Sequence, residues 1–272
     1  MAQLPRSTFF YQQRALASMN DKHASLKAQI ADVFHRHKGR YGYRRVAAVV
    51  RTNGQQVNRK TVQRLMGHLK LKCTLRPKRY RSYKGSQGPL VPDHLKRAFT
   101  AERMHQHWVT DVTEFNVGGE KLFLSPIMDL YNREIIAYET STQPSFPLVG
   151  HMLRKALRHR VDPVPLLLHS DQGWQYQMMA FRRLLAEHGI VQSMSRKGNC
   201  LDNAAMESFF AILKSEMFHG VRFANLDHLT EEIARYIDYY NHDRIKLKLD
   251  GLSPVQYRTQ ATATITQLPA VQ

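Results

Sequence analysis

The 272-residue chain has only two cysteines, Cys73 and Cys200, and neither belongs to a CxxC pair. Cysteine is therefore too scarce for a disulfide framework, and its spacing does not fit a zinc finger. No apolar run approaches the roughly 18 residues that span a membrane, and the N-terminus lacks the apolar segment of a secretory signal. These absences exclude secretion and membrane insertion and predict a cytoplasmic protein.

Acidic residues are almost missing from the first third of the chain. Residues 1–90 contain 20 Lys and Arg but only two acids, Asp21 and Asp32, whereas residues 91–272 contain 20 residues of each sign. The whole net charge of +18 therefore lies in the first third. A segment with so large an excess of basic residues is typical of a surface that binds phosphate-rich partners such as DNA. A solvated basic face, or contact with anionic lipid, is the alternative.

The basic segment shows the spacing of a helix-turn-helix. Apolar residues recur at helical intervals in residues 21–36 and again up to Val50, and a break at residues 53–54 precedes a further helix that begins near Asn58. That last helix could enter a DNA groove as a recognition helix, whereas a three-helix bundle with merely solvated arginines is the alternative. Its inward positions are expected to be Val62, Leu65, Met66 and Leu69.

A basic linker is predicted over residues 73–102. Its first part is rich in Arg, Lys, Tyr, Ser and Gly, contains three prolines and shows no sustained apolar period. The linker could follow a phosphate backbone or act only as a flexible spacer. The chain then divides into a helix-turn-helix-like domain at 1–72, this linker, a core at 103–220, and a C-terminal helical extension and tail at 221–272.

The core shows strands and helices in the order βββαβαβα. Three meandering strands followed by right-handed crossovers describe an α/β fold of the ribonuclease H type, with a mixed five-stranded sheet. An amphipathic helix around residues 226–240 follows the core. The expected strands are 108–117, 121–130, 134–141, 164–169 and 190–195, and the expected helices are 146–159, 176–188 and 201–217.

Three acidic residues, Asp111, Asp171 and Glu207, stand in informative contexts. The 35 residues between the last two mean little alone, because the chain has 12 Asp and 10 Glu. However, the two aspartates fall on or just after predicted strands and Glu207 falls on a helix, so all three could converge above one sheet edge. Hard divalent cations relieve the repulsion among such carboxylates. The arrangement predicts a two-metal phosphoryl-transfer site.

Several longer motifs are more specific than these acids alone. They are His37–Val46 (HKGRYGYRRV), Trp108–Thr113 (WVTDVT), His169–Gly173 (HSDQG), Ser195–Ala204 (SRKGNCLDNA) with Glu207, and Tyr240–Arg244 (YNHDR) with Leu252–Pro254. Through these motifs nearly the whole chain resembles the second-frame (OrfB) transposases of the bacterial insertion-sequence-three family, which belong to the retroviral-integrase superfamily. The resemblance implies a ribonuclease-H-like integrase catalytic core between the basic helical domain and the C-terminal extension.

The resemblance also implies an activity. Asp111, Asp171 and Glu207 match the family's DDE triad, which implies metal-dependent hydrolysis at the 3′ ends of an insertion sequence and attack of the freed 3′-hydroxyl on another DNA phosphate. The implied cofactor is Mg²⁺, with Mn²⁺ as a substitute and two ions when DNA is bound. A ribonuclease-H-like nuclease without strand transfer and a catalytically silent DNA-binding regulator are the competing functions.

The implied partners are double-stranded DNA, comprising insertion-sequence ends and target, further copies of the chain assembled on DNA, and an upstream-frame (OrfA) product or fusion. The last is expected because the chain lacks the zipper heptads of that frame. Such a protein would associate with the nucleoid. His169 either orients Asp171, contacts substrate or makes a structural hydrogen bond. The expected DNA-binding residues are Arg44, Arg45, Arg59, Lys60, Arg64, Arg79, Arg81, Arg196, Lys197 and Lys214.

Overall fold

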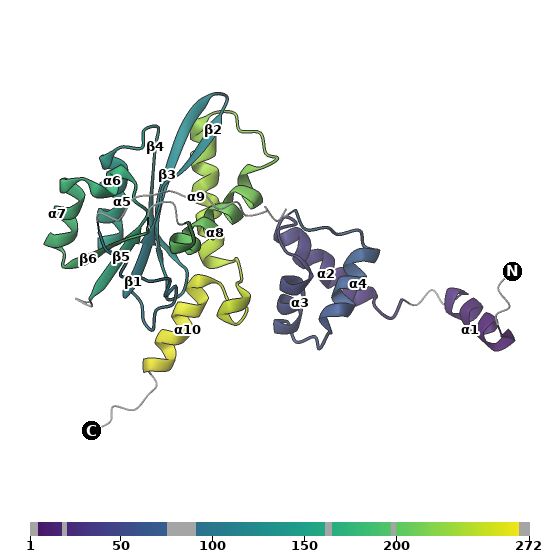
Figure 1. Cartoon of the computed structure of the whole chain (residues 1–272). Helices are drawn as coiled ribbons and strands as arrows, with labels where there is room; N and C mark the ends of the chain where they lie inside the picture. The colour runs from purple at the N-terminus through teal and green to yellow at the C-terminus, as the bar shows by residue number, and fades with distance from the viewer. Residues whose placement is uncertain (1–4, 18–20, 75–90, 161–164, 197–199, 267–272) are drawn as a thin grey trace, which may run out of the picture. The chain divides into compact units, whose positions relative to one another are not determined.

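The computed structural model describes residues 5–17, 21–74, 91–160, 165–196 and 200–266 (Figure 1). Its contacts divide the chain into two compact units, residues 1–74 and 75–272. None of the helices in the described ranges is both long and apolar enough to cross a membrane.

The N-terminal unit is helical. Helices α2 (Ala24–Arg36), α3 (Tyr43–Thr52) and α4 (Arg59–His68) pack together through a small apolar core, and α1 (Arg6–Ala17) precedes them. Asn58 caps α4, since its side-chain oxygen accepts a hydrogen bond from the Lys60 amide at 2.9 Å. The inward face predicted for α4 is confirmed at the buried residues Val62, Leu65 and Met66. Helix α1 was not predicted.

The motif between α2 and α3 builds a turn. Lys38 and Gly39 both have left-handed backbone, with φ of 52° and 72°. Tyr41 is fully buried and stacks on His37 at 3.8 Å between ring centroids. The guanidinium of Arg45 lies 5.5 Å from the Tyr41 ring. Much of this motif therefore fixes the angle between two helices.

The C-terminal unit is built on a mixed sheet. Strand β3 pairs antiparallel with β1, β2 and β4, while β1, β5 and β6 run parallel to one another. This pairing and the intervening helices confirm the predicted ribonuclease-H-type α/β fold. The strands are β1 (His107–Thr110), β2 (Thr113–Val117), β3 (Glu120–Asp129), β4 (Ile135–Ser141), β5 (Leu166–Ser170) and β6 (Ile190–Met194).

The described part of the sheet has six strands where five were predicted. The expected strand 108–117 is interrupted at Asp111 and Val112, where the Val112 amide donates to the Asp111 carboxylate at 2.7 Å. The expected helix 176–188 is likewise divided at Met178, whose backbone is extended. The pieces of that helix are α6 (Trp174–Gln177) and α7 (Met179–Glu187).

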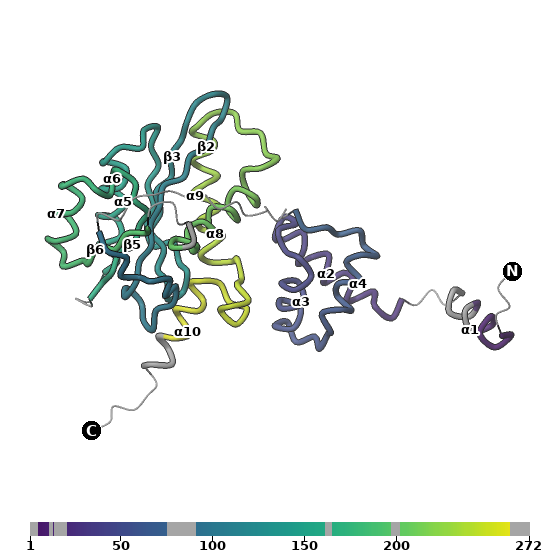
Figure 2. The backbone as a smooth tube through the Cα atoms, in the orientation of Figure 1, coloured from purple at the N-terminus to yellow at the C-terminus, as the bar shows by residue number. Residues whose placement is uncertain are grey.

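Helices cover both faces of the sheet, as Figures 1 and 2 show. Helices α5 (Phe146–Leu157), α6 and α7 pack on one face with Trp108, and α8 (Ala204–Leu213) and α9 (Leu226–His242) pack on the other face with Val109. Successive β1 residues thus point into opposite cores, as the alternation of a strand requires. Helix α10 (Pro254–Thr266) ends the described chain.

The predicted helix 201–217 consists of three parts. A 3-10 turn (Cys200–Asn203) leads into α8, and a π-helix (Lys214–Phe218) follows it. The π-helix contains Glu216, whose buried carboxylate receives two hydrogen bonds from the buried Arg244 guanidinium, at 2.7 and 2.9 Å. Tyr236 donates a third, at 2.8 Å. The end of the YNHDR motif therefore anchors the segment that follows α8.

Candidate active site

The two aspartates of the predicted triad lie side by side. Asp111 directly follows β1 and Asp171 directly follows β5, and the parallel register pairs Val109 with His169, each two residues before its acid. Neighbouring strands are about 4.8 Å apart. Both acids therefore stand at the carboxyl ends of adjacent parallel strands.

The pKa of Asp111 responds to the charges of its neighbours. Burial first, and then the charge of Asp171, raise the pKa of Asp111 well above its ordinary range, and the charge of Glu207 adds to this effect. The Val112 amide and the positive charge of Lys214 oppose it. Burial also raises the pKa of Asp171. Three carboxylates and one ammonium group are thus within electrostatic reach of one another.

Glu207 reaches this site from α8. Just before that helix, the side-chain amide of Asn203 donates to the Thr110 carbonyl at 3.1 Å, which ties the start of α8 to the end of β1. Lys214 follows the helix, and its ammonium group donates to the Glu114 carbonyl at 2.9 Å and lies 5.1 Å from the Phe115 ring. The sequence motifs gave no role to Asn203, although it lies inside one of them.

The loop after β5 fits closely around Asp171. The Gly173 amide donates to the Asp171 carboxylate at 2.9 Å, and a Cβ atom on Gly173 would lie 2.9 Å from the same oxygen. The buried Tyr176 hydroxyl lies 3.3 Å from the Thr110 hydroxyl. Burial, followed by the charges of Asp111 and Asp171, raises the pKa of Tyr176 well above its ordinary range. Sequence analysis missed this tyrosine.

The donor set fits a hard divalent cation. Carboxylate oxygens are the ligands that Mg²⁺ prefers. Burial is the first cause of the raised pKa of Asp111, and repulsion by Asp171 and Glu207, which a cation would relieve, adds to it. Across the part of the chain that the structure describes, however, no three His, Cys, Asp or Glu side chains are close enough together to form a ready-made metal site.

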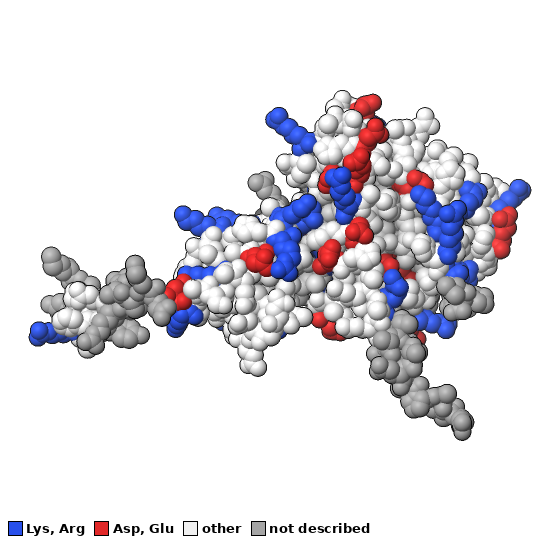
Figure 3. Space-filling view, turned by 180° about the vertical axis from the view of Figure 1, so that it is seen from behind, with Lys and Arg blue, Asp and Glu red and all other residues white. Residues whose placement is uncertain are grey.

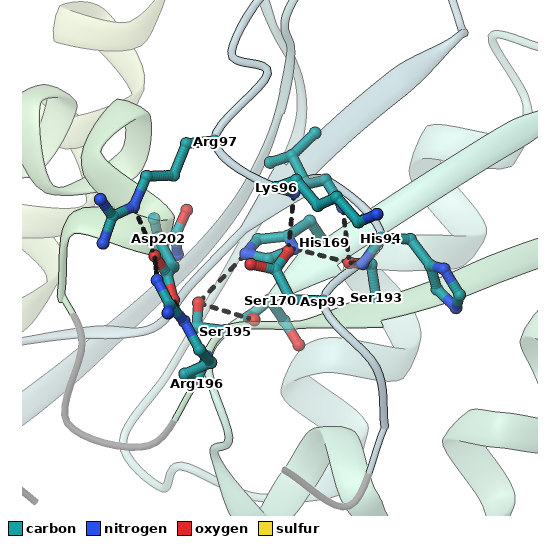
Figure 4. A network of polar contacts seen from close by, with 12 residues as sticks. Asp93, His94, Lys96, Arg97, His169, Ser170, Ser193, Ser195, Arg196 and Asp202 are labelled. Atoms are coloured by element: carbon teal, nitrogen blue, oxygen red, sulfur yellow. Dashed lines mark hydrogen bonds and ion pairs between the residues drawn. The ribbon is translucent and has the colours of Figure 1, made fainter. Parts of the chain in front are cut away.

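His169 makes structural hydrogen bonds (Figure 4). Its Nδ1 lies 2.8 Å from the Ser193 hydroxyl, which already accepts backbone N–H bonds from His94 and Leu95. The Ser193 proton must therefore point to Nδ1, which leaves Nε2 as the donor to Ser195 at 3.1 Å. Burial lowers the pKa of His169, in keeping with this neutral form. Through Ser193, the histidine therefore links β5 to β6 and to the segment before β1 by hydrogen bonds.

Asp202, in the turn before α8, is also fixed. Arg196 donates to it through Nε at 3.0 Å and a terminal nitrogen at 3.2 Å, and Arg97 donates at 2.8 Å (Figure 4). Burial opposes ionisation, but these hydrogen bonds lower the pKa of Asp202 to about 2. The turn that leads to Glu207 is thereby tied to β6 and to the segment before β1.

The predicted DNA-binding residues occupy different environments. Arg44 and three α4 residues, Arg59, Lys60 and Arg64, are exposed, whereas Arg45 is half-buried against Tyr41. On the face drawn in Figure 3, acidic side chains lie among the lysines and arginines of the C-terminal unit, as the equal numbers of basic and acidic residues in 91–272 lead one to expect. Arg79, Arg81 and Lys197, together with linker residues 75–90, lie outside the described residues.

Known families match most of the chain. Residues 101–200 match the family described as integrase core domain, and residues 207–261 match a second family of the same description. Residues 21–80 match the HTH-like domain family. A helix-turn-helix-like unit followed by an integrase core defines the chain as an integrase-like protein.

Similarity to individual proteins is also extensive. The chain is 51% identical to the InsK protein of insertion sequence element IS150 from Escherichia coli (strain K12), over 95% of this chain and 91% of that protein. It is 33% identical to the transposase for insertion sequence element IS904 from Lactococcus lactis, and 32% identical to transposase InsF for insertion sequence IS3A from Escherichia coli. These two matches each cover 85% of this chain and cover 92% and 81% of the relatives. The chain belongs to the insertion-sequence-three family of transposases, as its motifs predicted.

Solved structures similar to the chain are retroviral integrases. The catalytic core of the HTLV-2 integrase, in complex with magnesium, matches 62% of this chain and 97% of its own, with a TM-score of 0.44 and 14% identity. The catalytic core of the BIV integrase matches 60% of this chain and 99% of its own, with a TM-score of 0.43 and 16% identity.

Proposed function

We propose that this chain is a DNA transposase that performs metal-dependent cleavage at the 3′ ends of an insertion sequence and then transfers the freed ends to target DNA. One observation carries the proposal. Asp111 and Asp171 end neighbouring parallel strands, and the charges of Glu207 and Lys214 act on Asp111. The same proposal includes the division into a DNA-binding unit at 1–72, a linker at 73–102, a catalytic core at 103–220 and a C-terminal extension.

In this mechanism Asp111, Asp171 and Glu207 would hold Mg²⁺, or Mn²⁺ in its place, with two ions when DNA is bound. Such ions activate the attacking oxygen and stabilise the leaving oxygen. The protein positions these carboxylates through the Asn203 hydrogen bond to β1 and the Gly173 amide on Asp171. Lys214 brings a positive charge to the same site, where it would contact DNA.

Two displacements at phosphorus complete the reaction. In the first, a water oxygen bonds to the phosphorus at the element's end, and the bond from phosphorus to the 3′-oxygen breaks, leaving a 3′-hydroxyl and a 5′-phosphate. In the second, that 3′-oxygen bonds to a target phosphorus and loses its proton to solvent, while the target strand's own 3′-oxygen leaves. No covalent bond to the protein is needed.

The N-terminal unit would recognise DNA through α4. Its exposed face carries Arg59, Lys60 and Arg64, while its other face is buried. Further copies of the chain and an upstream-frame product are the proposed partners in assembling the two ends of the element.

Replacing one exposed arginine of α4 tests this recognition. Arg64→Gln is expected to weaken binding to DNA carrying an end of the element by roughly 1–3 kcal/mol, because an arginine contact in the groove is lost. Fluorescence anisotropy with labelled duplex measures the change. Arg36→Gln is the matched control, because Arg36 is an exposed α2 residue paired with Asp32. Equal losses in the two variants would refute a specific role for α4.

A substitution at Gly173 tests the fit around Asp171. An alanine Cβ would lie 2.9 Å from the Asp171 carboxylate, so Gly173→Ala must displace that side chain or the loop. We expect DNA cleavage to fall by about 10²-fold, the effect of a small misplacement of reacting groups, with DNA affinity unchanged. Gly189→Ala has no neighbour within 4 Å but carries the cost of a left-handed backbone, with φ of 62°, which Gly173→Ala avoids because its φ is −53°. It therefore gives an upper limit to the effect of a general loss of stability. Full cleavage by Gly173→Ala would show that the close fit is unimportant.

The reaction itself distinguishes the candidate functions. The chain, alone and fused to the upstream-frame product, is incubated with Mg²⁺ and labelled DNA carrying the element's own ends. Joined products support transposition. Nicks without joining would favour a hydrolytic nuclease, and binding without cleavage even in the fusion would favour a silent regulator.

A further inference from the structure

A second cationic site lies beside the proposed active site. A cavity of about 340 Å³ is lined by Asp93, Lys96, Arg97 and Arg196. Three of these four residues are basic, and Lys96 and Arg97 come from the segment before β1. Figure 4 shows this segment and Arg196 approaching Asp202 from two parts of the chain.

The backbone that carries two of these cations is strained. Lys96 and Arg97 are consecutive non-glycine residues with φ of 46° and 63°. Left-handed backbone is unfavourable for residues with a Cβ, and it persists only where the surroundings hold it. Here the Lys96 amide donates to the Asp93 carboxylate at 2.9 Å, and Ser193 accepts from the two amides that precede Lys96. Such strain is characteristic of a functional segment.

Asp202 orients the two arginines without neutralising the site. Its carboxylate is fully buried, whereas the side chains of Arg97 and Arg196 are 45% and 56% exposed. Asp93 turns its carboxylate inward to cap the Lys96 turn and is only 13% exposed. Three cations against two carboxylates leave a net charge of +1 on this group, with the positive charges on the solvent side.

The site adjoins the proposed catalytic edge. Arg196 lies two residues beyond β6, and β6 is the parallel neighbour of β5, which leads to Asp171. The Ser195 amide donates to the Ser170 carbonyl at 2.9 Å. The residue after the end of β6 is therefore still hydrogen-bonded to the last residue of β5, next to Asp171. A DNA strand with a phosphate at the acids could therefore reach the cavity with a nearby phosphate.

We propose that Lys96, Arg97 and Arg196 form a phosphate-binding site for the DNA strand that enters the active site. The inference rests on the proposed transposase function. The site takes one backbone phosphodiester, with Lys96 as its mobile cation and the Asp202-bound arginines as its fixed cations. It holds the strand in register with the acids.

The test removes the Lys96 charge and leaves the Asp202 contacts intact. Affinity of the full chain for duplex carrying an element end is measured in Mg²⁺-free buffer from about 0.05 to 0.2 M salt. The logarithm of the DNA-binding constant K falls linearly with the logarithm of the salt concentration, and losing one phosphate contact makes this slope less steep by about 0.9. The same loss weakens binding roughly eightfold at 0.1 M salt. Both Lys96→Gln and Lys96→Gly are expected to show this loss, although glycine relieves the backbone strain.

Lys155→Gln is the matched control, because Lys155 is a half-exposed α5 lysine that pairs with Glu139 in a different part of the unit. Its slope should stay at the wild-type value. An unchanged slope in Lys96→Gln, or an equal fall in Lys155→Gln, would overturn the inference. The binding assay needs no catalysis, so the two proposals can fail separately. If the wild-type chain joins DNA but Lys96→Gln keeps the wild-type slope, only this inference is refuted. A chain that never cleaves DNA would sink the proposed function instead.

Discussion

Asp111→Asn should reduce metal-dependent cleavage and joining by about a thousandfold or more. The charges of Asp171 and Glu207 raise the pKa of Asp111, and the charge of Lys214 lowers it. Its loss would remove a proposed metal ligand worth several kcal/mol in the transition state, and each 1.4 kcal/mol is a factor of ten. Rates are measured on labelled DNA ends under single-turnover conditions. Glu207→Gln should behave in the same way, and both variants should keep wild-type DNA affinity.

Thermal unfolding separates this effect from misfolding. Without metal, Asp111→Asn should unfold at the wild-type temperature or above it, because the substitution removes a buried charge that two carboxylates repel. Mg²⁺ should raise the unfolding temperature of the wild type more than that of the variant, since a ligand stabilises only the state that binds it. A variant that cleaves DNA normally would remove Asp111 from the mechanism.

Arg244→Met should lower the free energy of unfolding by roughly 3–5 kcal/mol. The substitution leaves the Glu216 carboxylate buried without its cationic partner, which is the costly way to break a buried ion pair. Urea denaturation measures the loss. The double variant Arg244→Met/Glu216→Gln should recover most of the stability, because glutamine carries no charge and still accepts the Tyr236 hydrogen bond.

An exposed arginine on α9 supplies the control for this pair. Arg235 bonds to Glu231 and Glu232, but its side chain is 65% exposed. Arg235→Met should therefore cost no more than about 1 kcal/mol. If Arg244→Met cost as little, Glu216 and Arg244 would not form the buried anchor after α8.

The features that sequence predicted well are those fixed by local pattern. An apolar run that ends at Leu168 placed Asp171 on or just after a strand, and the helical spacing of Val62, Leu65 and Met66 predicted the buried face of α4. The side-by-side position of the two aspartates follows from the parallel pairing of β1 and β5, whereas the βαβ crossover through α5 connects β4 to β5, so the order of elements alone did not specify this pairing.

The features that sequence missed depend on contacts between distant residues or on single hydrogen bonds. At the break after β1, the Asp111 carboxylate accepts a hydrogen bond from the next amide, which no apolar pattern records. Arg97 and Asp202 are 105 residues apart, so their pairing could not be read from spacing. Arg45 stays a predicted DNA-binding residue, and its half-buried position against Tyr41 is visible only in the folded unit.

The most direct test of the central claim replaces the leaving 3′-oxygen at the scissile phosphate with sulfur. Mn²⁺ accepts softer ligands than Mg²⁺, so an ion held by Asp111, Asp171 and Glu207 against that atom should reveal itself in the metal dependence. We expect the sulfur-containing DNA to be cleaved poorly in Mg²⁺, and we expect Mn²⁺ to restore the rate. An equal slowing in both metals would show that no metal ion contacts the leaving oxygen, and would contradict the proposed active site.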